Sequence, residues 1–152
     1  MTARFADAIQ IVDHAAPDAA QRFVTSLKDT GFAVLNPHPI PTPLMTKVYD
    51  DWAGFFASEA KHDYTHDPEV QEGYFPFRCE QAKDSTIMDL KEFYHVYPHG
   101  PVPETVESLT RQLYDALHVL GLSLLDWLEQ HTPEDVRQRV SKPLPEMMSG
   151  SS

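Results

Sequence analysis

One long apolar stripe constrains this chain more than any other feature of its sequence. Between about Glu104 and Gln130, apolar residues recur every three or four positions, which is the spacing of one face of an α-helix. The stripe consists of Val106, Leu109, Leu113, Leu117, Leu120, Leu124 and Leu128. The sequence therefore predicts a single long helix over about residues 104–130.

Shorter helices are predicted on both sides of this stripe. Pro17 opens the first of them, and Gly31 stands where a C-terminal cap is expected. Thr42 is expected to cap a second helix, and Thr132 a short last one, because a threonine hydroxyl can accept a bond from a free backbone N–H. No regular element is expected from Pro143 onward.

A few short segments have the composition of β-strands. They are residues 9–12, 32–35, 73–77 and 92–97. The segment 32–35 is apolar throughout and predicts a buried strand. These strands are too few and too scattered to close a barrel or a sandwich. We therefore predict a helix-rich α+β fold, with a single domain over residues 1–152 and a polar, flexible tail at about 143–152.

Composition narrows the class of protein. Twelve Lys and Arg stand against 23 Asp and Glu, for a net charge of −11. We expect no nucleic-acid partner and no anionic membrane surface, because both require a basic patch. The single cysteine, Cys79, excludes a disulfide framework. No apolar run approaches the roughly 20 residues that span a bilayer, and the N-terminus resembles no signal peptide, so a cytoplasmic protein is expected.

Two histidines raise the question of a metal site. His62 and His66 are four positions apart, and on an α-helix they would share one face, as zinc ligands can. The segment is strongly polar, so a solvated surface stretch is the alternative interpretation. None of the eight histidines is followed two positions later by Asp or Glu. The H-x-D or H-x-E pair of non-haem iron oxygenases is therefore missing, and we predict no catalytic residue in this chain.

Three segments, in this order, resemble one protein family. They are Asp29–Asn36, then Phe55–Lys61, and then a stretch that begins with Gly73–Phe77 and continues through Glu80, residues 82–84 and Asp89–Phe93. They are similar to the N-terminal domain of isopenicillin N synthase-like Fe(II)/2-oxoglutarate-dependent dioxygenases. The resemblance covers about residues 5–148.

The resemblance implies half of an oxidoreductase. In complete members a double-stranded β-helix barrel follows and carries the iron ligands and the 2-oxoglutarate site. This chain would be the helical module that buttresses the barrel and lines part of the substrate pocket, without catalysis or a cofactor of its own. It would be a fragment, a natural truncation or one piece of a split enzyme. Its partner would be the missing barrel, or a second copy that covers the barrel-facing surface. The alternative is a stand-alone, non-catalytic binding or regulatory module.

The chain departs from isopenicillin N synthase at two positions in this half. An arginine that binds substrate there lies two positions before the Gly-Tyr pair, and a tyrosine follows the pair. Those positions are Gln71 and Phe75 in this chain. Without the arginine, the chain lacks a bidentate hydrogen-bond donor for a substrate carboxylate at this position. This difference implies a different substrate. Gln71 and Phe75 are the residues expected to line the pocket.

Overall fold

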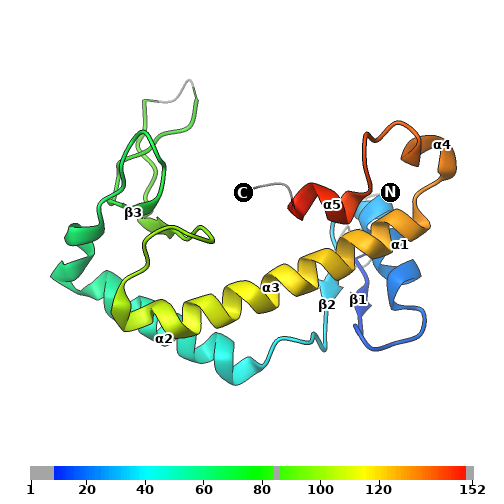
Figure 1. Cartoon of the computed structure of the whole chain (residues 1–152), viewed down its shortest axis with the longest axis horizontal. Helices are drawn as coiled ribbons and strands as arrows, with labels where there is room; N and C mark the ends of the chain where they lie inside the picture. The colour runs from blue at the N-terminus through cyan, green and yellow to red at the C-terminus, as the bar shows by residue number, and fades with distance from the viewer. Residues whose placement is uncertain (1–8, 84–85, 150–152) are drawn as a thin grey trace, which may run out of the picture. The chain divides into compact units, whose positions relative to one another are not determined.

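Helices dominate the computed structural model, which describes residues 9–83 and 86–149 (Figure 1). The α-helices are α1 (Ala19–Thr30), α2 (Thr42–Ala57), α3 (Glu104–His131), α4 (Glu134–Arg137) and α5 (Leu144–Ser149), and η2 (Glu59–Tyr64) is a 3₁₀ helix. The strands are β1 (Ile11–Val12), β2 (Val34–Leu35), β3 (Gly73–Phe75) and β4 (Phe93–His95). The described residues form no closed barrel, which confirms the helix-rich α+β prediction.

The chain separates into two compact units, which are described one at a time. One unit combines the described residues up to Pro41 with those from Tyr114 onward, and the other is Thr42–Leu113. The helix α3 contributes its first part to the second unit and its remainder to the first. The single domain over residues 1–152 stays a prediction.

The first unit contains a parallel pair of strands. β1 and β2 align Ile11 with Val34 and Val12 with Leu35. The helix α1 connects them and ends at Gly31, whose φ of 79° is a left-handed conformation that a residue without Cβ adopts at little cost. The buried Ser26 of α1 accepts the Gln10 N–H at 2.9 Å and donates to the Phe32 carbonyl at 2.7 Å. This side chain therefore ties the helix to the segments at both of its ends.

Two sequence predictions about this unit are wrong. The segment 32–35 is not buried, because Phe32 is 66% exposed and Val34 46%. The hydroxyl of Thr132 donates to the Leu128 carbonyl at 2.6 Å, so it closes the end of α3 and does not cap α4. Both features depend on where other elements lie, which local residue patterns do not record.

A third correction concerns the segment after Pro143. The sequence predicts no regular element there, yet α5 forms. The N–H of Leu144 at the start of α5 donates to the Glu129 carboxylate of α3 at 3.1 Å. Such a bond satisfies one of the backbone donors that a helix start leaves free. The acceptor is 15 residues away, so the local sequence gives no sign of it.

The second unit is built around an antiparallel hairpin and an aromatic core. β3 and β4 align Gly73 with His95, Tyr74 with Tyr94 and Phe75 with Phe93. The helix α2 lies beside the first part of α3 (Figure 1), where the Trp52 indole N–H donates to the Thr110 hydroxyl at 2.9 Å. The core consists of Phe55, Val102 and Val106, with Trp52, Phe56, Tyr64, Tyr94 and Val96 packed against it.

Because side chains alternate along a strand, the hairpin has two different faces. Tyr74 and Tyr94 contact the aromatic side chains of α2, with ring centroids 6.2 Å from Phe56 and 5.8 Å from Phe55. Phe75 and Phe93 stack on each other on the opposite face. The hairpin therefore packs one face against the core, and its other face carries Phe75 and the Phe93 ring that stacks on it.

Candidate functional site

Gln71, the first pocket candidate, occupies a strained turn just before β3. Its φ of 60° is left-handed, which is uncommon for any residue other than glycine. The Gln71 N–H donates to the Asp67 carbonyl at 2.8 Å, and the side-chain amide donates to the Pro68 carbonyl at 2.6 Å. The Gln71 carbonyl lies 3.1 Å from His95 Nδ1. The residue as a whole is exposed.

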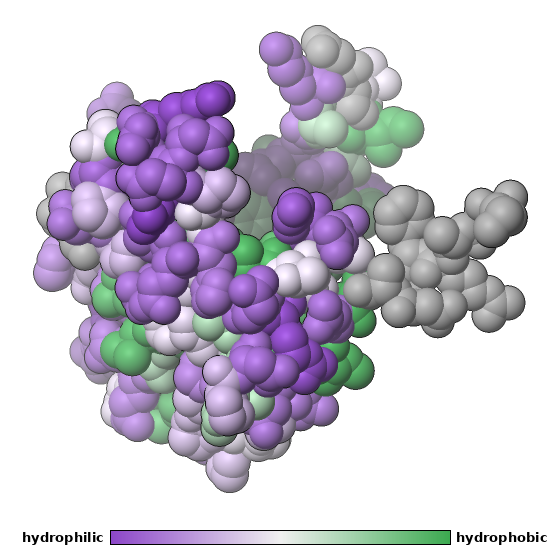
Figure 2. All heavy atoms as spheres, turned by 90° about the vertical axis from the view of Figure 1, so that its right-hand side faces the viewer, coloured by the Kyte–Doolittle hydropathy of each residue, from purple (hydrophilic) through white to green (hydrophobic). Residues whose placement is uncertain are grey.

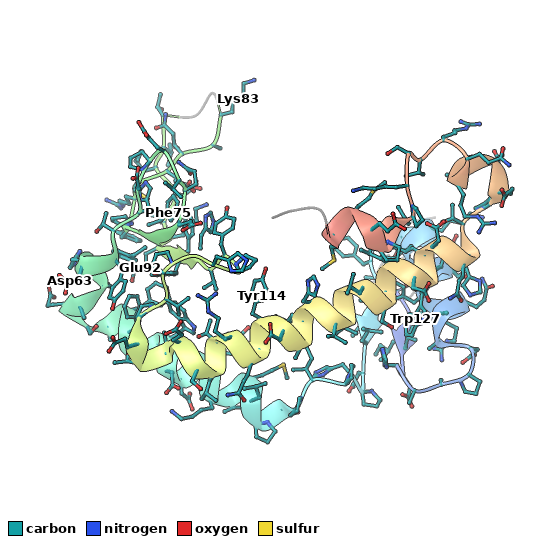
Figure 3. The ribbon with its side chains drawn as sticks, viewed as in Figure 1. Asp63, Phe75, Lys83, Glu92, Tyr114 and Trp127 are labelled. Atoms are coloured by element: carbon teal, nitrogen blue, oxygen red, sulfur yellow. The ribbon has the colours of Figure 1, made fainter. Side chains whose placement is uncertain are left out.

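Phe75, the second candidate, belongs to β3 (labelled in Figure 3). Only 2% of the residue is exposed. Its ring is stacked between His66, at 3.9 Å between ring centroids, and Phe93, at 4.5 Å, with interplanar angles of 10° and 11°. The structure therefore brings the two candidates into one hairpin, with Gln71 at the surface and Phe75 in a layer of aromatic rings.

A cluster of polar side chains, which the sequence did not predict, is centred on the Glu92 carboxylate. One oxygen of its carboxylate accepts a bond from the Tyr74 hydroxyl at 2.5 Å and another from Lys61 Nζ at 2.9 Å. Lys61 Nζ also donates to the Phe56 carbonyl at 2.8 Å. These bonds join α2, η2, β3 and the residue that precedes β4. The signal was present in the sequence, because Phe55-Phe56, Lys61 and Glu92 all belong to the segments that resemble the family.

The side chains of this cluster change one another's pKa values. The hydrogen bond from Tyr74, followed by that from Lys61, lowers the pKa of the Glu92 carboxyl. The hydrogen bond to Glu92 raises the pKa of the Lys61 ammonium. Burial is the main cause that raises the pKa of the Tyr74 hydroxyl. The carboxylate and the ammonium are therefore both held in their charged forms around neutral pH, which suits a structural clamp better than proton transfer.

The two histidines of the possible metal site do not share a helical face. The helix there is the 3₁₀ helix η2, and it ends at Tyr64, before His66. His62 is exposed, with its Nε2 3.8 Å from Glu59, whereas the His66 ring lies on Phe75. The described residues hold no group of three or more His, Cys, Asp or Glu side chains placed to bind a metal ion. They do not fit the iron site that the resemblance implies for complete members of the family.

Part of the resemblance lies outside the described residues. This applies to residues 5–8 and to Asp84 in the stretch after Gly73–Phe77. Within the described part of the chain, no helix combines the length and the apolar character that crossing a membrane requires.

Comparison with solved structures indicates the class of protein that this fold represents. The crystal structure of a "Putative oxygenase from Shewanella oneidensis" superposes with a TM-score of 0.81 and 38% sequence identity. The match covers 91% of this chain but 48% of that one, so this chain spans about half the length of its structural neighbour. No curated protein matches. The fold is thus that of a module found in an oxygenase.

The family itself follows from the sequence match. Residues 5–119 match the family described as "non-haem dioxygenase in morphine synthesis N-terminal". The match extends over most of the chain, and the chain belongs to this family of non-haem dioxygenase N-terminal domains. The resemblance stated from the three sequence segments is confirmed.

Proposed function

We propose that this chain serves as the N-terminal helical module of an Fe(II)/2-oxoglutarate-dependent oxygenase of the isopenicillin N synthase-like type. It buttresses a catalytic barrel and contributes part of the wall of the substrate pocket, and it carries out no catalysis alone. One observation carries the proposal: nearly all of this chain superposes on about half of the Shewanella oneidensis protein. The other half of that protein has room for a barrel, and the described residues of this chain form none.

Exposed apolar side chains on the β1–β2 pair support the buttressing role. Parallel strands in proteins are almost always covered on both faces. Here Ile11 of β1 is 60% exposed, and the neighbouring Phe32 and Val34 are 66% and 46% exposed. Hydrophobic areas interrupt a largely hydrophilic surface in the view of Figure 2. We expect the barrel to cover the β1–β2 surface, and a second copy of the chain to cover it when no barrel is present.

The Gln71 turn supports the pocket-lining role. A side-chain amide oxygen at the surface can accept a hydrogen bond from a substrate. A neutral amide cannot pair with a carboxylate as a guanidinium does, so the substrate differs from one held by an arginine at this position. Phe75 acts from the layer below, where its stacked ring supports the strand that follows Gln71.

The proposal assigns iron and 2-oxoglutarate to the barrel. In complete members the metal would activate O₂, and the described residues hold no group of three or more His, Cys, Asp or Glu side chains placed to bind a metal ion. A cytoplasmic location belongs to the same proposal, in keeping with a single cysteine. Anaerobic calorimetry on the purified chain should detect no micromolar binding of Fe(II) or 2-oxoglutarate. Tight binding that a point mutation abolishes would contradict the assignment.

A chimera tests the buttressing role directly. This chain replaces the matched half of the Shewanella oneidensis protein, and the product is analysed by size exclusion with light scattering and by thermal unfolding. We expect a monodisperse protein with one cooperative transition. The matched control carries Ile11→Lys and Val34→Lys, which place two charges on the β1–β2 surface and should lower the yield of folded chimera. A control that folds equally well would show that this surface does not contact the barrel.

The isolated chain separates this proposal from the stand-alone module. We expect it to self-associate, because the β1–β2 surface then has no barrel to cover it. The Ile11→Lys, Val34→Lys variant should shift the equilibrium toward the monomer. A chain that stays monomeric at high concentration with low binding of a hydrophobic dye would favour the stand-alone module instead.

A further inference from the structure

The imidazole of His95 is bound to the backbone of the Gln71 turn. His95 lies at the end of β4, opposite Gly73. Its Nδ1 is 3.1 Å from the Gln71 carbonyl oxygen. A carbonyl oxygen only accepts hydrogen bonds, so Nδ1 must carry the proton. In the neutral ring, Nε2 is then unprotonated and acts as an acceptor.

This bond differs from the others that hold the turn. The Gln71 N–H and its side-chain amide donate to Asp67 and Pro68, which lie within four residues in the sequence. His95 is 24 residues away and belongs to the facing strand. The bond from His95 is therefore the contact among these three that fixes the turn relative to the hairpin.

The orientation of the His95 ring is itself determined by packing. Its ring centroid lies 4.7 Å from that of Phe75 and 4.8 Å from that of Phe93. Phe75 is in turn stacked on both His66 and Phe93. The buried Phe75 ring and the half-buried Phe93 ring thus support the exposed imidazole, and the imidazole supports a left-handed residue that costs conformational energy.

We propose that His95, as its Nδ1–H tautomer, is the positioning residue that sets the Gln71 amide in the wall of the substrate pocket. This inference rests on the proposed pocket-lining role of Gln71. It extends that role, because it explains how an exposed residue in a strained turn keeps one geometry. It also assigns Nε2 of His95 as a second acceptor beside the turn, so this part of the wall selects for hydrogen-bond donors on the substrate.

The tautomer is measurable on the unmodified chain. Two-bond ¹H–¹⁵N correlation spectra, recorded at a pH where the ring is neutral, distinguish a protonated from an unprotonated ring nitrogen. We expect a pyrrole-like Nδ1 and a pyridine-like Nε2 for His95. The opposite assignment would overturn the proposal, because no hydrogen bond to the Gln71 carbonyl could then form.

Two variants test whether the bond positions the turn. His95→Asn retains an N–H donor at about the place of Nδ1, and His95→Leu removes it. We expect the Gln71 backbone amide to exchange with solvent about 3–10-fold faster in His95→Leu, which corresponds to one hydrogen bond of ordinary strength, and at close to the original rate in His95→Asn. The Gly31 amide, which donates to Leu27 in the other unit, is the internal control and should not change. Equal Gln71 exchange in all three proteins would refute the positioning role.

These readouts need no substrate, so they are separate from the test of the proposed function. If the chimera fails but the tautomer and the exchange rates are as expected, the pocket is elsewhere while His95 still positions Gln71. If the chimera succeeds but the Gln71 amide exchanges at the same rate in His95→Leu and in the unmodified chain, positioning by His95 is refuted while the module role stands.

Discussion

Replacing Phe75 by alanine should cost the Thr42–Leu113 unit a large part of its stability. The ring is 2% exposed and is stacked on both sides, at 3.9 Å from His66 and 4.5 Å from Phe93. Buried Phe→Ala substitutions cost about 3–5 kcal/mol, from lost transfer energy and from the cavity that remains. Two stacked neighbours are rigid and cannot collapse fully into the gap, so we expect a loss of about 4 kcal/mol.

Phe77 provides a matched control two positions further along the same segment. It is 55% exposed, so Phe77→Ala should change the free energy of unfolding by less than about 1 kcal/mol. The measurement is urea denaturation of both variants, followed by circular dichroism and by the fluorescence of Trp52 in a Trp127→Phe background. A loss below about 1 kcal/mol for Phe75→Ala, or equal losses for both variants, would refute the assignment of Phe75 to a packed layer.

Four further predictions concern the same unit. Gly73→Ala should destabilise it by more than about 2 kcal/mol in denaturation experiments, because φ is 101° and a Cβ would lie 2.6 Å from a backbone oxygen. Gly54→Ala, which meets nothing within 4 Å in α2, should stabilise it by about 0.5–1 kcal/mol. Trp52→Phe should cost about 1 kcal/mol by loss of the bond to Thr110, and a double-mutant cycle with Thr110→Val should recover a coupling of that size. Burial raises the pKa of Tyr94 from 10.0 to about 12, so the unfolded chain loses this proton first, and stability should fall between pH 10 and 12 unless Tyr94→Phe removes the effect.

Local patterns were sufficient to predict most elements of the fold. The stripe from Val106 to Leu128 lies in α3, and Gly31 ends α1 as predicted. These features depend on periodicity and on the left-handed conformation that glycine allows, and both are properties of neighbouring residues. The parallel pairing of β1 with β2 could not be predicted from such patterns, because it joins residues 23 positions apart, such as Ile11 and Val34.

The sequence singled out candidate site residues but not the geometry around them. Alignment with the family's Gly-Tyr pair singled out Gln71 and Phe75, yet nothing local distinguishes an exposed turn from a buried ring. His62 and His66 likewise have the spacing of partners on one α-helical face, whereas η2 is a 3₁₀ helix that ends before His66. The meeting of His95 with Gln71 depends on the register of the hairpin, which only the structure provides.

The clamp at Glu92 determines what the family resemblance means for this chain. Lys61 and Glu92 both lie in the segments that resemble the family, and Tyr74 is the tyrosine of the Gly-Tyr pair. In the structure these three side chains bond to one another, and Lys61 also bonds to the Phe56 carbonyl. The residues that identify the family here are therefore residues that hold the module together. A chain can retain all of them and keep this fold without retaining any particular reaction, so these residues carry information about the fold and not about a substrate.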